Sequence, residues 1–211
     1  ICGMAGARQG WLEAPYVETP ALLAHLVEGA VSPDTTDRFR VRILPGVCQR
    51  TTGGEDVMRG EETQLLGLLA LRPGFEGPVV MPGTHSKWVH VEDGRIARFA
   101  TAMTGELFDV LGTHSVLRHA LGGERMGAST EDGVAAGLEA GLAHPEELTS
   151  LLFRTRAASL LSERGSDWCS GYLSGLLVGT EIGGRRNWLG DETIPLVGSP
   201  RLCRLYGAAI K

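Results

Sequence analysis

A short segment in the middle of the chain combines side chains that can bind a phosphate group. It reads Pro82-Gly83-Thr84-His85-Ser86-Lys87 and lies between two short apolar runs. Glycine lets the backbone approach a phosphate closely, while hydroxyl and ammonium groups can donate hydrogen bonds to its oxygens. On spacing alone, an ordinary hairpin turn with its polar side chains in solvent explains the segment somewhat better. A hydrolase-like pair of Ser86 and His85 is disfavoured, because adjacent residues on a strand point to opposite faces.

Carboxylates upstream of this segment could accept the proton of a substrate hydroxyl. Asp56 ends a polar loop, and Glu61 and Glu62 open a strongly predicted helix over residues 61–71. A well-placed carboxylate is a common general base. The alternative for Asp56 is a loop or capping role. Acidic residues in the first turn of a helix also complement its dipole, which is our preferred explanation for Glu62 and an open one for Glu61.

Arg8 and Arg59 are candidates for binding the carboxylate of a small ligand. A planar guanidinium can hold a carboxylate through two parallel hydrogen bonds. Arg8 lies in a glycine-flanked turn, where Gln9 could add a hydrogen bond to a ligand hydroxyl. All but two of the 20 basic residues are arginines, so an ordinary surface position is the alternative for both.

Two further turns contribute candidate residues. Thr104 and Gly105 start a predicted helix soon after the strands that flank residues 82–87, so they could face the same ligand. Thr104 could equally serve as a helix cap. Gly198 follows a predicted strand over 194–197 and would let the backbone approach a purine base, although a plain turn also fits.

The elements that must position these residues alternate between strands and helices. Short apolar segments predict strands over residues 1–5, 39–44, 79–81, 88–91, 95–100 and 194–197. The strand over 39–44 shows period-2 alternation and should end at Pro45-Gly46, and Glu92-Asp93-Gly94 predicts a tight turn. Helical periodicity predicts helices over residues 21–28, 61–71, 105–111, 115–121, 131–143, 146–163, 168–182 and from 201 onward. Such alternation indicates an α/β fold and not a helical bundle or a β-sandwich. The best domain boundary lies between residues 72 and 78.

The composition argues against nucleic-acid binding, membrane binding and a structural zinc site. The formal net charge is −5 and the basic residues form no run, which disfavours nucleic-acid and anionic-membrane binding. No stretch approaches the roughly 20 apolar residues of a membrane span, and no signal segment opens the chain, so we expect a cytoplasmic protein. The four cysteines lack zinc-type spacing, and we expect no protein-bound structural metal.

Five segments, taken together, resemble one family. They are GMAGARQGW (3–11) with APYV (14–17), DVMRGEETQ (56–64), PGTHSKWV (82–89), MTGELF (103–108) and LSGLLVGTE (173–181). In this order they are similar to the 2-dehydro-3-deoxygalactonokinases, and the resemblance spans residues 3–208. The resemblance makes a phosphate site the preferred interpretation of residues 82–87, in place of an ordinary solvent-exposed hairpin turn.

The resemblance implies a two-lobed actin/hexokinase-like (ribonuclease H-like) fold with ATP in the cleft between the lobes. Residues 1–76 would be the remainder of the first lobe and residues 77–211 the second. The opening hairpin of the first lobe is absent, so we expect a chain truncated at both ends. We also expect a homo-oligomer to be possible.

The resemblance also implies the roles of the candidate residues. ATP and Mg²⁺ would be required, with Mg²⁺ held mainly by phosphates, and the reaction would phosphorylate the 6-hydroxyl of 2-dehydro-3-deoxygalactonate. Asp56, or alternatively Glu61, would be the base, and Arg8, Gln9 and Arg59 would bind the sugar acid. The phosphate and nucleotide residues would be Gly83, Thr84, His85, Ser86, Lys87, Thr104, Gly105 and Gly198. The alternatives are a kinase of another sugar or sugar acid and a catalytically silent sugar-acid-binding module.

Overall fold

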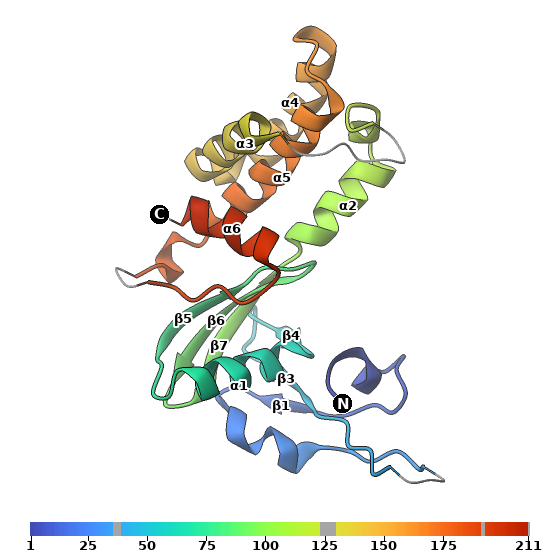
Figure 1. The fold of residues 1–211 in the computed structure, drawn as a ribbon, viewed down its shortest axis with the longest axis vertical. Helices are drawn as coiled ribbons and strands as arrows, with labels where there is room; N and C mark the ends of the chain where they lie inside the picture. Colours follow the sequence, from blue (N-terminus) through green and yellow to red (C-terminus); the bar gives the residue numbers. More distant parts are fainter. Residues whose placement is uncertain (36–38, 123–129, 191–192, 211) are drawn as a thin grey trace. The chain divides into compact units, whose positions relative to one another are not determined.

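The computed structural model describes residues 1–35, 39–122, 130–190 and 193–210, which form two compact units. Unit 1 comprises Ile1–Met81 and Lys87–Thr101, and unit 2 comprises Pro82–Ser86 and Ala102–Lys211. Strands and helices occur in mixed order along the chain, as an α/β protein requires (Figure 1). The division into lobes 1–76 and 77–211 groups the strands around residues 79–100 differently and stays a prediction.

Unit 1 contains two small sheets. The first has the order β1-β3-β4, with β1 (Tyr16–Glu18) parallel and β4 (Asp56–Met58) antiparallel to the central β3 (Gly46–Gln49). The second has the order β2-β7-β6-β5, formed by β2 (Ala21–Leu22), β5 (Gly77–Met81), β6 (Ser86–Glu92) and β7 (Arg95–Ala102). Trp88, Val89 and Phe99 from this sheet are buried, so it carries much of the apolar core of the unit.

The hairpin between β6 and β7 confirms the tight turn expected at residues 92–94. Asp93 and Gly94 have φ values of 48° and 70°, the left-handed backbone of a two-residue hairpin loop. Aspartate and glycine are the residues that tolerate this conformation best. The predicted strands over 79–81, 88–91 and 95–100 are all present.

Helix α1 (Glu61–Leu71) is present over the predicted residues, and two 3₁₀ helices, η1 (Gly3–Gly6) and η2 (Leu23–Gly29), complete unit 1.

In unit 2, α5 (Ser166–Gly183) is the most buried helix, and its neighbours include α2 (Thr104–His114), α3 (Glu131–Ala143), α4 (Leu148–Leu161) and α6 (Pro200–Ala209). Shorter 3₁₀ segments are η3 (Val116–His119), η4 (Pro145–Glu147) and η5 (Arg186–Trp188). One apolar cluster joins η3 to α5 through Leu117, Leu121, Cys169, Leu173 and Leu177.

Helices α3 and α5 pack unusually closely, side by side in Figure 1, because glycines face each other along their contact. A Cβ added at Gly137 would lie 2.1 Å from the carbonyl oxygen of Tyr172, and one at Gly175 would lie 2.2 Å from that of Val134. No side chain fits at such distances, so the two backbones are in direct contact. Gly171 and Gly175 therefore serve the packing of α5 against α3.

Several local predictions were wrong, and half of the errors fall in the N-terminal third. Residues 1–5 form no strand, because Gly3 has φ +81° and the chain turns into η1. Residues 39–44 form only an isolated bridge between Ile43 and Val31, and the strand begins at Gly46 instead. A Cβ at Gly46 would lie 2.5 Å from the carbonyl oxygen of Met58, so the residue expected to end a strand is the one that lets two strands approach.

Other elements differ in type or length. Residues 21–28 divide into β2 and η2, and residues 115–121 form the 3₁₀ helix η3 where an α-helix was expected. Residues 146–163 divide into η4 and α4 at Leu148. Residues 194–197 are not a strand: only Leu196 makes a bridge before α6 begins.

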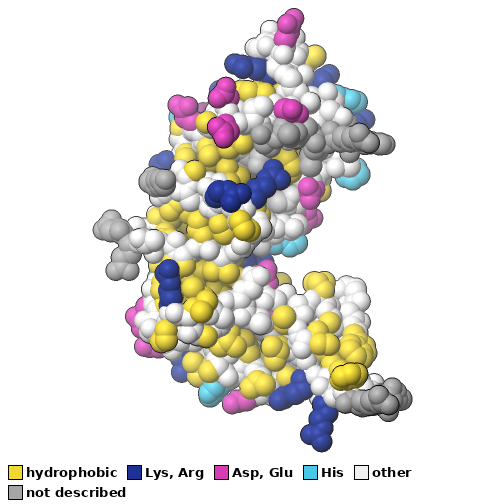
Figure 2. All heavy atoms as spheres, in the orientation of Figure 1, with side chains coloured by type: hydrophobic (Ala, Val, Ile, Leu, Met, Phe, Trp, Pro, Cys, Tyr) yellow, Lys and Arg dark blue, Asp and Glu magenta, His cyan; other side chains and the backbone are white. Residues whose placement is uncertain are grey.

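Charged side chains of both signs are scattered over the face drawn in Figure 2, and its Lys and Arg side chains lie in small separate groups. Among the residues that the structure describes, no helix has both the length and the apolar character needed to span a bilayer.

We predict that Gly137→Ala lowers the free energy of unfolding by about 1–3 kcal/mol, because the new methyl group must push α3 away from α5. The matched control is Gly67→Ala on α1, where an added Cβ meets nothing within 4 Å. That change should raise stability by about 0.5–1 kcal/mol, since alanine loses less backbone entropy than glycine in a helix. Urea denaturation followed by circular dichroism measures both. Equal effects of the two substitutions would contradict the close helix contact.

Candidate functional site

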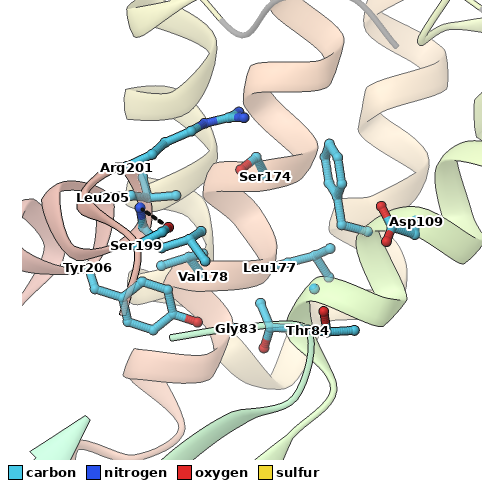
Figure 3. A pocket seen from close by; sticks show the side chains of 14 residues that line it. Gly83, Thr84, Asp109, Ser174, Leu177, Val178, Ser199, Arg201, Leu205 and Tyr206 are labelled. Carbon is cyan, nitrogen blue, oxygen red and sulfur yellow. Dashed lines mark hydrogen bonds between the residues drawn. The ribbon is translucent and has the colours of Figure 1, made fainter. Parts of the chain in front are cut away.

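Unit 2 contains a cavity of about 400 Å³ beside the turn that joins β5 to β6. Its lining comes from four segments (Figure 3): Gly83 and Thr84 of the turn; Thr104, Gly105, Phe108 and Asp109 of α2; Ser174, Leu177 and Val178 of α5; and Ser199 with Arg201, Leu202, Leu205 and Tyr206 at the start of α6. The structure therefore brings together four residues predicted to bind phosphate or nucleotide: Gly83, Thr84, Thr104 and Gly105. Volumes of this order are typical of small-ligand pockets.

The cavity is suited to an anion because two helices begin at its wall. Helix α2 starts at Thr104, and α6 starts at Pro200 with Ser199 as its N-cap, whose Oγ accepts a hydrogen bond from Leu202 N at 3.4 Å. The helix dipole is positive at this end, and the first N–H groups of a helix lack intrahelical acceptors. Glu106 N already donates to the carbonyl oxygen of Thr84 at 3.1 Å, and Pro200 has no N–H, so the dipoles and the remaining N–H groups of the first turns favour the anion. Arg201 supplies the positive charge and Asp109 the negative charge among the described lining residues.

Two predicted glycines are needed for the close packing around the turn. A Cβ at Gly105 would lie 2.7 Å from both the carbonyl oxygen of Gly83 and the Cα of Thr84. A Cβ at Gly198 would lie 2.9 Å from the carbonyl oxygen of Pro82. Gly198 is therefore beside the turn, although it is not among the residues that line the cavity.

Two predicted hydroxyls belong to a buried hydrogen-bond network beneath the cavity. The Oγ of Ser86 lies 2.9 Å from the hydroxyl of Tyr206, which donates to Oε2 of Glu181 at 2.6 Å. Thr104 Oγ1 donates to the same oxygen. Burial and the nearby Glu181 carboxylate, which also accepts a hydrogen bond from the phenol, raise the pKa of Tyr206 well above its usual value, so the phenol keeps its proton.

His85, on the same turn, takes a different partner. Its Nε2 pairs with Oε2 of Glu106 on α2, and both side chains are partly exposed. Ser86 and His85 thus do not share a hydrogen bond, as the strand geometry predicts. His85 does not line the cavity in this structure.

Lys87 belongs to unit 1, where its ammonium lies 3.7 Å from Oε1 of Glu61. Only 5% of the lysine side chain is exposed. The other oxygen of Glu61 accepts the backbone N–H of Arg59 at 3.1 Å. Two residues predicted for different roles, a phosphate ligand and an alternative base, therefore form one ion pair.

The neighbouring Glu62 is fully buried and caps the same helix. Both of its carboxylate oxygens accept the backbone N–H of Gly60, at 2.8 and 2.6 Å. Burial raises the pKa of Glu62 above its ordinary value, and the backbone hydrogen bonds partly oppose that rise. Glu62 lies in the first turn of α1, as the helix-dipole explanation assumes, and it also bonds to the backbone before the helix; its role stays a prediction.

Asp56 lies at the start of β4 and is held by β7. Its Oδ2 accepts from Thr101 N, and its Oδ1 accepts from Thr101 Oγ1, both at 2.6 Å. Oδ1 also accepts from Val57 N at 2.7 Å. A carboxylate offers about four acceptor positions, so these bonds leave room for one more donor, on Oδ2.

Asp56 also lines a second cavity, which lies within unit 1. This cavity has a volume of about 680 Å³ and is lined by Tyr16, Cys48, Gln49, Arg50, Glu55, Asp56 and Val57. The guanidinium of Arg59 lies 4.2 Å above the ring of Tyr16 and donates from Nη2 to the carbonyl oxygen of Ala14 at 2.9 Å. Its Nε and Nη1 are buried without an acceptor among the described residues. Arg59 is not among the lining residues of this cavity, and neither are Arg8 and Gln9, which are exposed.

Comparisons with known proteins agree with the segments identified in the sequence. The family model for 2-keto-3-deoxy-galactonokinase matches residues 1–211. The chain belongs to the 2-keto-3-deoxy-galactonokinase family.

Individual relatives of this family match along the full chain. A Rhizobium meliloti (strain 1021) protein named "Probable 2-dehydro-3-deoxygalactonokinase DgoK1" is 45% identical over 212 residues, which cover 100% of this chain and 69% of the relative. The 2-dehydro-3-deoxygalactonokinase of Escherichia coli (strain K12) is 38% identical with the same coverage. A crystal structure of a Sinorhizobium meliloti protein, named as a candidate 2-dehydro-3-deoxygalactonokinase, has a TM-score of 0.91 and 44% identity, and the match covers 100% of this chain and 68% of that chain.

Membership of the 2-keto-3-deoxy-galactonokinase family makes this chain a kinase, with ATP as the phosphoryl donor that such an enzyme uses. The cavity in unit 2 provides the hydroxyls, helix starts and glycines that a phosphate group needs. Glu181, Tyr206, Asp109 and Arg201 complete its surroundings, although none of them was predicted from the sequence. A signal for Glu181 exists, since it is the single charged residue in the apolar run 171–183 of α5.

We predict that Glu62→Gln changes the pH dependence of stability in this kinase. A folded-state pKa above the unfolded value means that the folded protein binds more protons, so wild-type stability should fall as pH rises from about 4.5 through the raised pKa. Glutamine cannot ionise but keeps an acceptor for Gly60, so the variant should lack this loss. Urea unfolding from about pH 4 to about pH 8 measures the difference. Glu76→Gln, at an exposed position, is the control, and parallel curves for wild type and Glu62→Gln would refute the prediction.

Proposed function

We propose that this chain phosphorylates the 6-hydroxyl of 2-dehydro-3-deoxygalactonate with ATP, and that the ATP phosphates bind in the cavity of unit 2. The sugar hydroxyl attacks the γ-phosphorus, the bond to the bridging oxygen of ADP breaks, and the hydroxyl proton passes to a carboxylate. Family membership supports the reaction. The cavity beside Gly83 and Thr84 supports the placement of ATP.

The convergence of two helix starts on one turn is the observation that carries this placement. Phosphates bind readily at helix N-termini, because the N–H groups and the dipole both favour negative charge. Helices α2 and α6 both begin at the cavity, and the hydroxyls of Thr84 and Ser199 add further donors. Transfer of a phosphoryl group depends mainly on positioning and on such electrostatic stabilisation.

Mg²⁺ fits this cavity as a partner of ATP. Magnesium is usually bound through one or two carboxylates together with substrate phosphates, and the carboxylate of Asp109 lies in the lining. When bound, the ion would offset charge on the β- and γ-phosphate oxygens. The protein's own part is to hold the phosphates with backbone N–H groups, hydroxyls and Arg201.

We place the sugar acid in unit 1, at the cavity lined by Asp56. The free acceptor position on Asp56 Oδ2 can take a substrate hydroxyl proton, and Glu61 is the alternative base. The buried Nε and Nη1 of Arg59 support a role in binding the sugar-acid carboxylate, because buried donors in folded proteins are almost always paired. Arg50 lines the cavity of Asp56, whereas Arg59 and Arg8 do not, so Arg50 is a second candidate for this role.

We extend the proposal to the architecture and the setting of the enzyme. A two-lobed actin/hexokinase-like fold, a cytoplasmic location and a small-molecule substrate pair are the setting that this reaction implies. The strand-turn-strand at residues 77–92 has the form of a phosphate-binding hairpin, which supports the architecture.

A coupled ADP-release assay on the full-length gene product tests the proposed reaction. We expect ADP formation that requires 2-dehydro-3-deoxygalactonate and Mg²⁺, with ATP hydrolysis at background level when the sugar acid is omitted. A panel of neutral hexoses and other sugar acids is the control. Turnover of another member of the panel, with none of the dehydro-deoxy acid, would assign a different substrate. Sugar-acid binding by calorimetry without ADP formation would instead favour a silent binding module.

Paired substitutions identify the general base. Asp56→Asn should lower kcat by about 10²–10⁴-fold while ATP affinity stays close to that of wild type, because it removes a proton acceptor and keeps the shape. Glu61→Gln is the matched comparison. If Asp56→Asn lowers only the melting temperature and Glu61→Gln abolishes turnover, the base is Glu61, and Asp56 serves to tie β4 to β7.

A further inference from the structure

The buried network under the cavity has a fixed direction, and a single carboxylate sets that direction. Carboxylate oxygens only accept hydrogen bonds, so the single proton of the Tyr206 hydroxyl is donated to Glu181. The hydrogen bond between Tyr206 and Ser86 Oγ must therefore be donated by Ser86. Ser86 Oγ also lies 3.4 Å from the backbone nitrogen and 3.5 Å from the carbonyl oxygen of Gly83. Because its one proton goes to Tyr206 at the shorter distance of 2.9 Å, the Ser86 oxygen is left to accept the backbone N–H of Gly83.

This directed chain ends in the turn that lines the cavity. It runs from Gly83 N–H through Ser86 and Tyr206 to Glu181, which also accepts from Thr104 at the start of α2. Helices α2 and α6 are thus hydrogen-bonded directly to Glu181 of α5, through Thr104 and Tyr206. The turn is linked to Glu181 through the hydroxyl of Tyr206. Figure 3 shows the Tyr206 hydroxyl pointing toward the turn that carries Gly83 and Thr84.

The network has little freedom to adjust. The exposed fractions are 0% for Ser86, 1% for Tyr206, 7% for Glu181 and 9% for Thr104, so water does not readily replace a lost bond. Backbone contacts at Gly105 and Gly198 also hold the turn on both sides. Loss of one of these hydrogen bonds should therefore change how the turn is oriented, while the contacts at Gly105 and Gly198 keep the rest of the unit folded.

We propose that Glu181 is a positioning residue for the nucleotide site: through Tyr206 and Thr104 it holds the 82–86 turn and the starts of α2 and α6 in the geometry that receives the ATP phosphates. The proposal rests on the placement of ATP in this cavity. It assigns Glu181 no contact with substrate. It also gives Ser86 a different role from the predicted one, since its hydroxyl orients the turn and does not donate to a phosphate.

The test measures KM for each substrate in Tyr206→Phe, which removes only the hydroxyl that links Glu181 to Ser86. We expect KM for ATP to rise about tenfold, the equivalent of one good hydrogen bond, and KM for the sugar acid to change less than about twofold. Glu181→Gln should raise KM for ATP at least as much, because an amide that donates to Tyr206 reverses the chain. Tyr172→Phe is the matched control: Tyr172 is a buried tyrosine of α5 that lines neither cavity, and its loss of a hydroxyl should leave both KM values unchanged.

A double-mutant cycle distinguishes a connected chain from independent structural effects. Ser86→Ala should raise KM for ATP by a similar factor, and the double variant Ser86→Ala/Tyr206→Phe should be no worse than either single variant. Factors that multiply in the double variant would overturn the proposal. So would a fall in melting temperature with unchanged KM for ATP in all variants, because that pattern belongs to a purely structural role.

ATP affinity measured by calorimetry keeps this test separate from that of the proposed reaction. If the wild-type enzyme binds ATP but does not phosphorylate the sugar acid, the proposed substrate fails, while the ATP affinities of Tyr206→Phe and Glu181→Gln still decide the role of Glu181. If Thr84→Val weakens ATP binding and Tyr206→Phe does not, the ATP site stands and the positioning role is refuted. If the wild type binds no ATP, both proposals fall together.

Discussion

A buried carboxylate must be hydrogen-bonded, and this requirement organises both units of the chain. Glu62 in unit 1 and Glu181 in unit 2 are each almost completely removed from solvent. Leaving such a group without donors would cost far more than one ordinary hydrogen bond contributes, so the surrounding segments must present donors to it. Glu62 takes the N–H of Gly60 and fixes the start of α1. Glu181 takes two hydroxyls and draws α2 and α6 to the same point.

The position of Glu181 depends in turn on the glycine contact between α3 and α5. Helix α5 presents Gly171, Gly175 and Gly179 to α3, while Ser174, Leu177 and Val178 line the cavity. With no side chains between the two backbones, the distance between the helices is set by hard contact. One face of α5 is thus a fixed support, and the other carries Glu181 and the cavity wall. The same 18-residue helix therefore links the packing of the unit to the geometry of the site.

Local patterns predicted the parts of this chain whose structure is local. Helices α1 and α3 were predicted over their observed residues, and the β6–β7 hairpin followed from its Asp-Gly turn. The wrong predictions fall on segments whose secondary structure is determined by contacts with residues far away in the sequence. Gly46 reads as the end of a strand, yet its lack of a side chain lets β3 approach Met58 on β4. The site shows the same division, because Gly83, Thr84, Thr104 and Gly105 belong to recognisable segments, whereas Tyr206 is bonded to Ser86 across 120 residues and no local pattern announces it.

The charges around the cavity explain why lysine is not needed in its lining. A nucleotide triphosphate carries several negative charges, and Arg201 is the cation among the described lining residues. The starts of α2 and α6 add about half a positive charge each, and a bound Mg²⁺ would add two. Lys87 is instead paired with Glu61, whose carboxylate offsets the charge of the ammonium. The N–H groups at a helix start are held in place by the backbone, whereas a lysine ammonium lies at the end of a flexible side chain. The N–H groups are therefore in position before the phosphate binds. Fixing the two helix starts through Glu181 is then the same task as preparing the site for phosphoryl transfer.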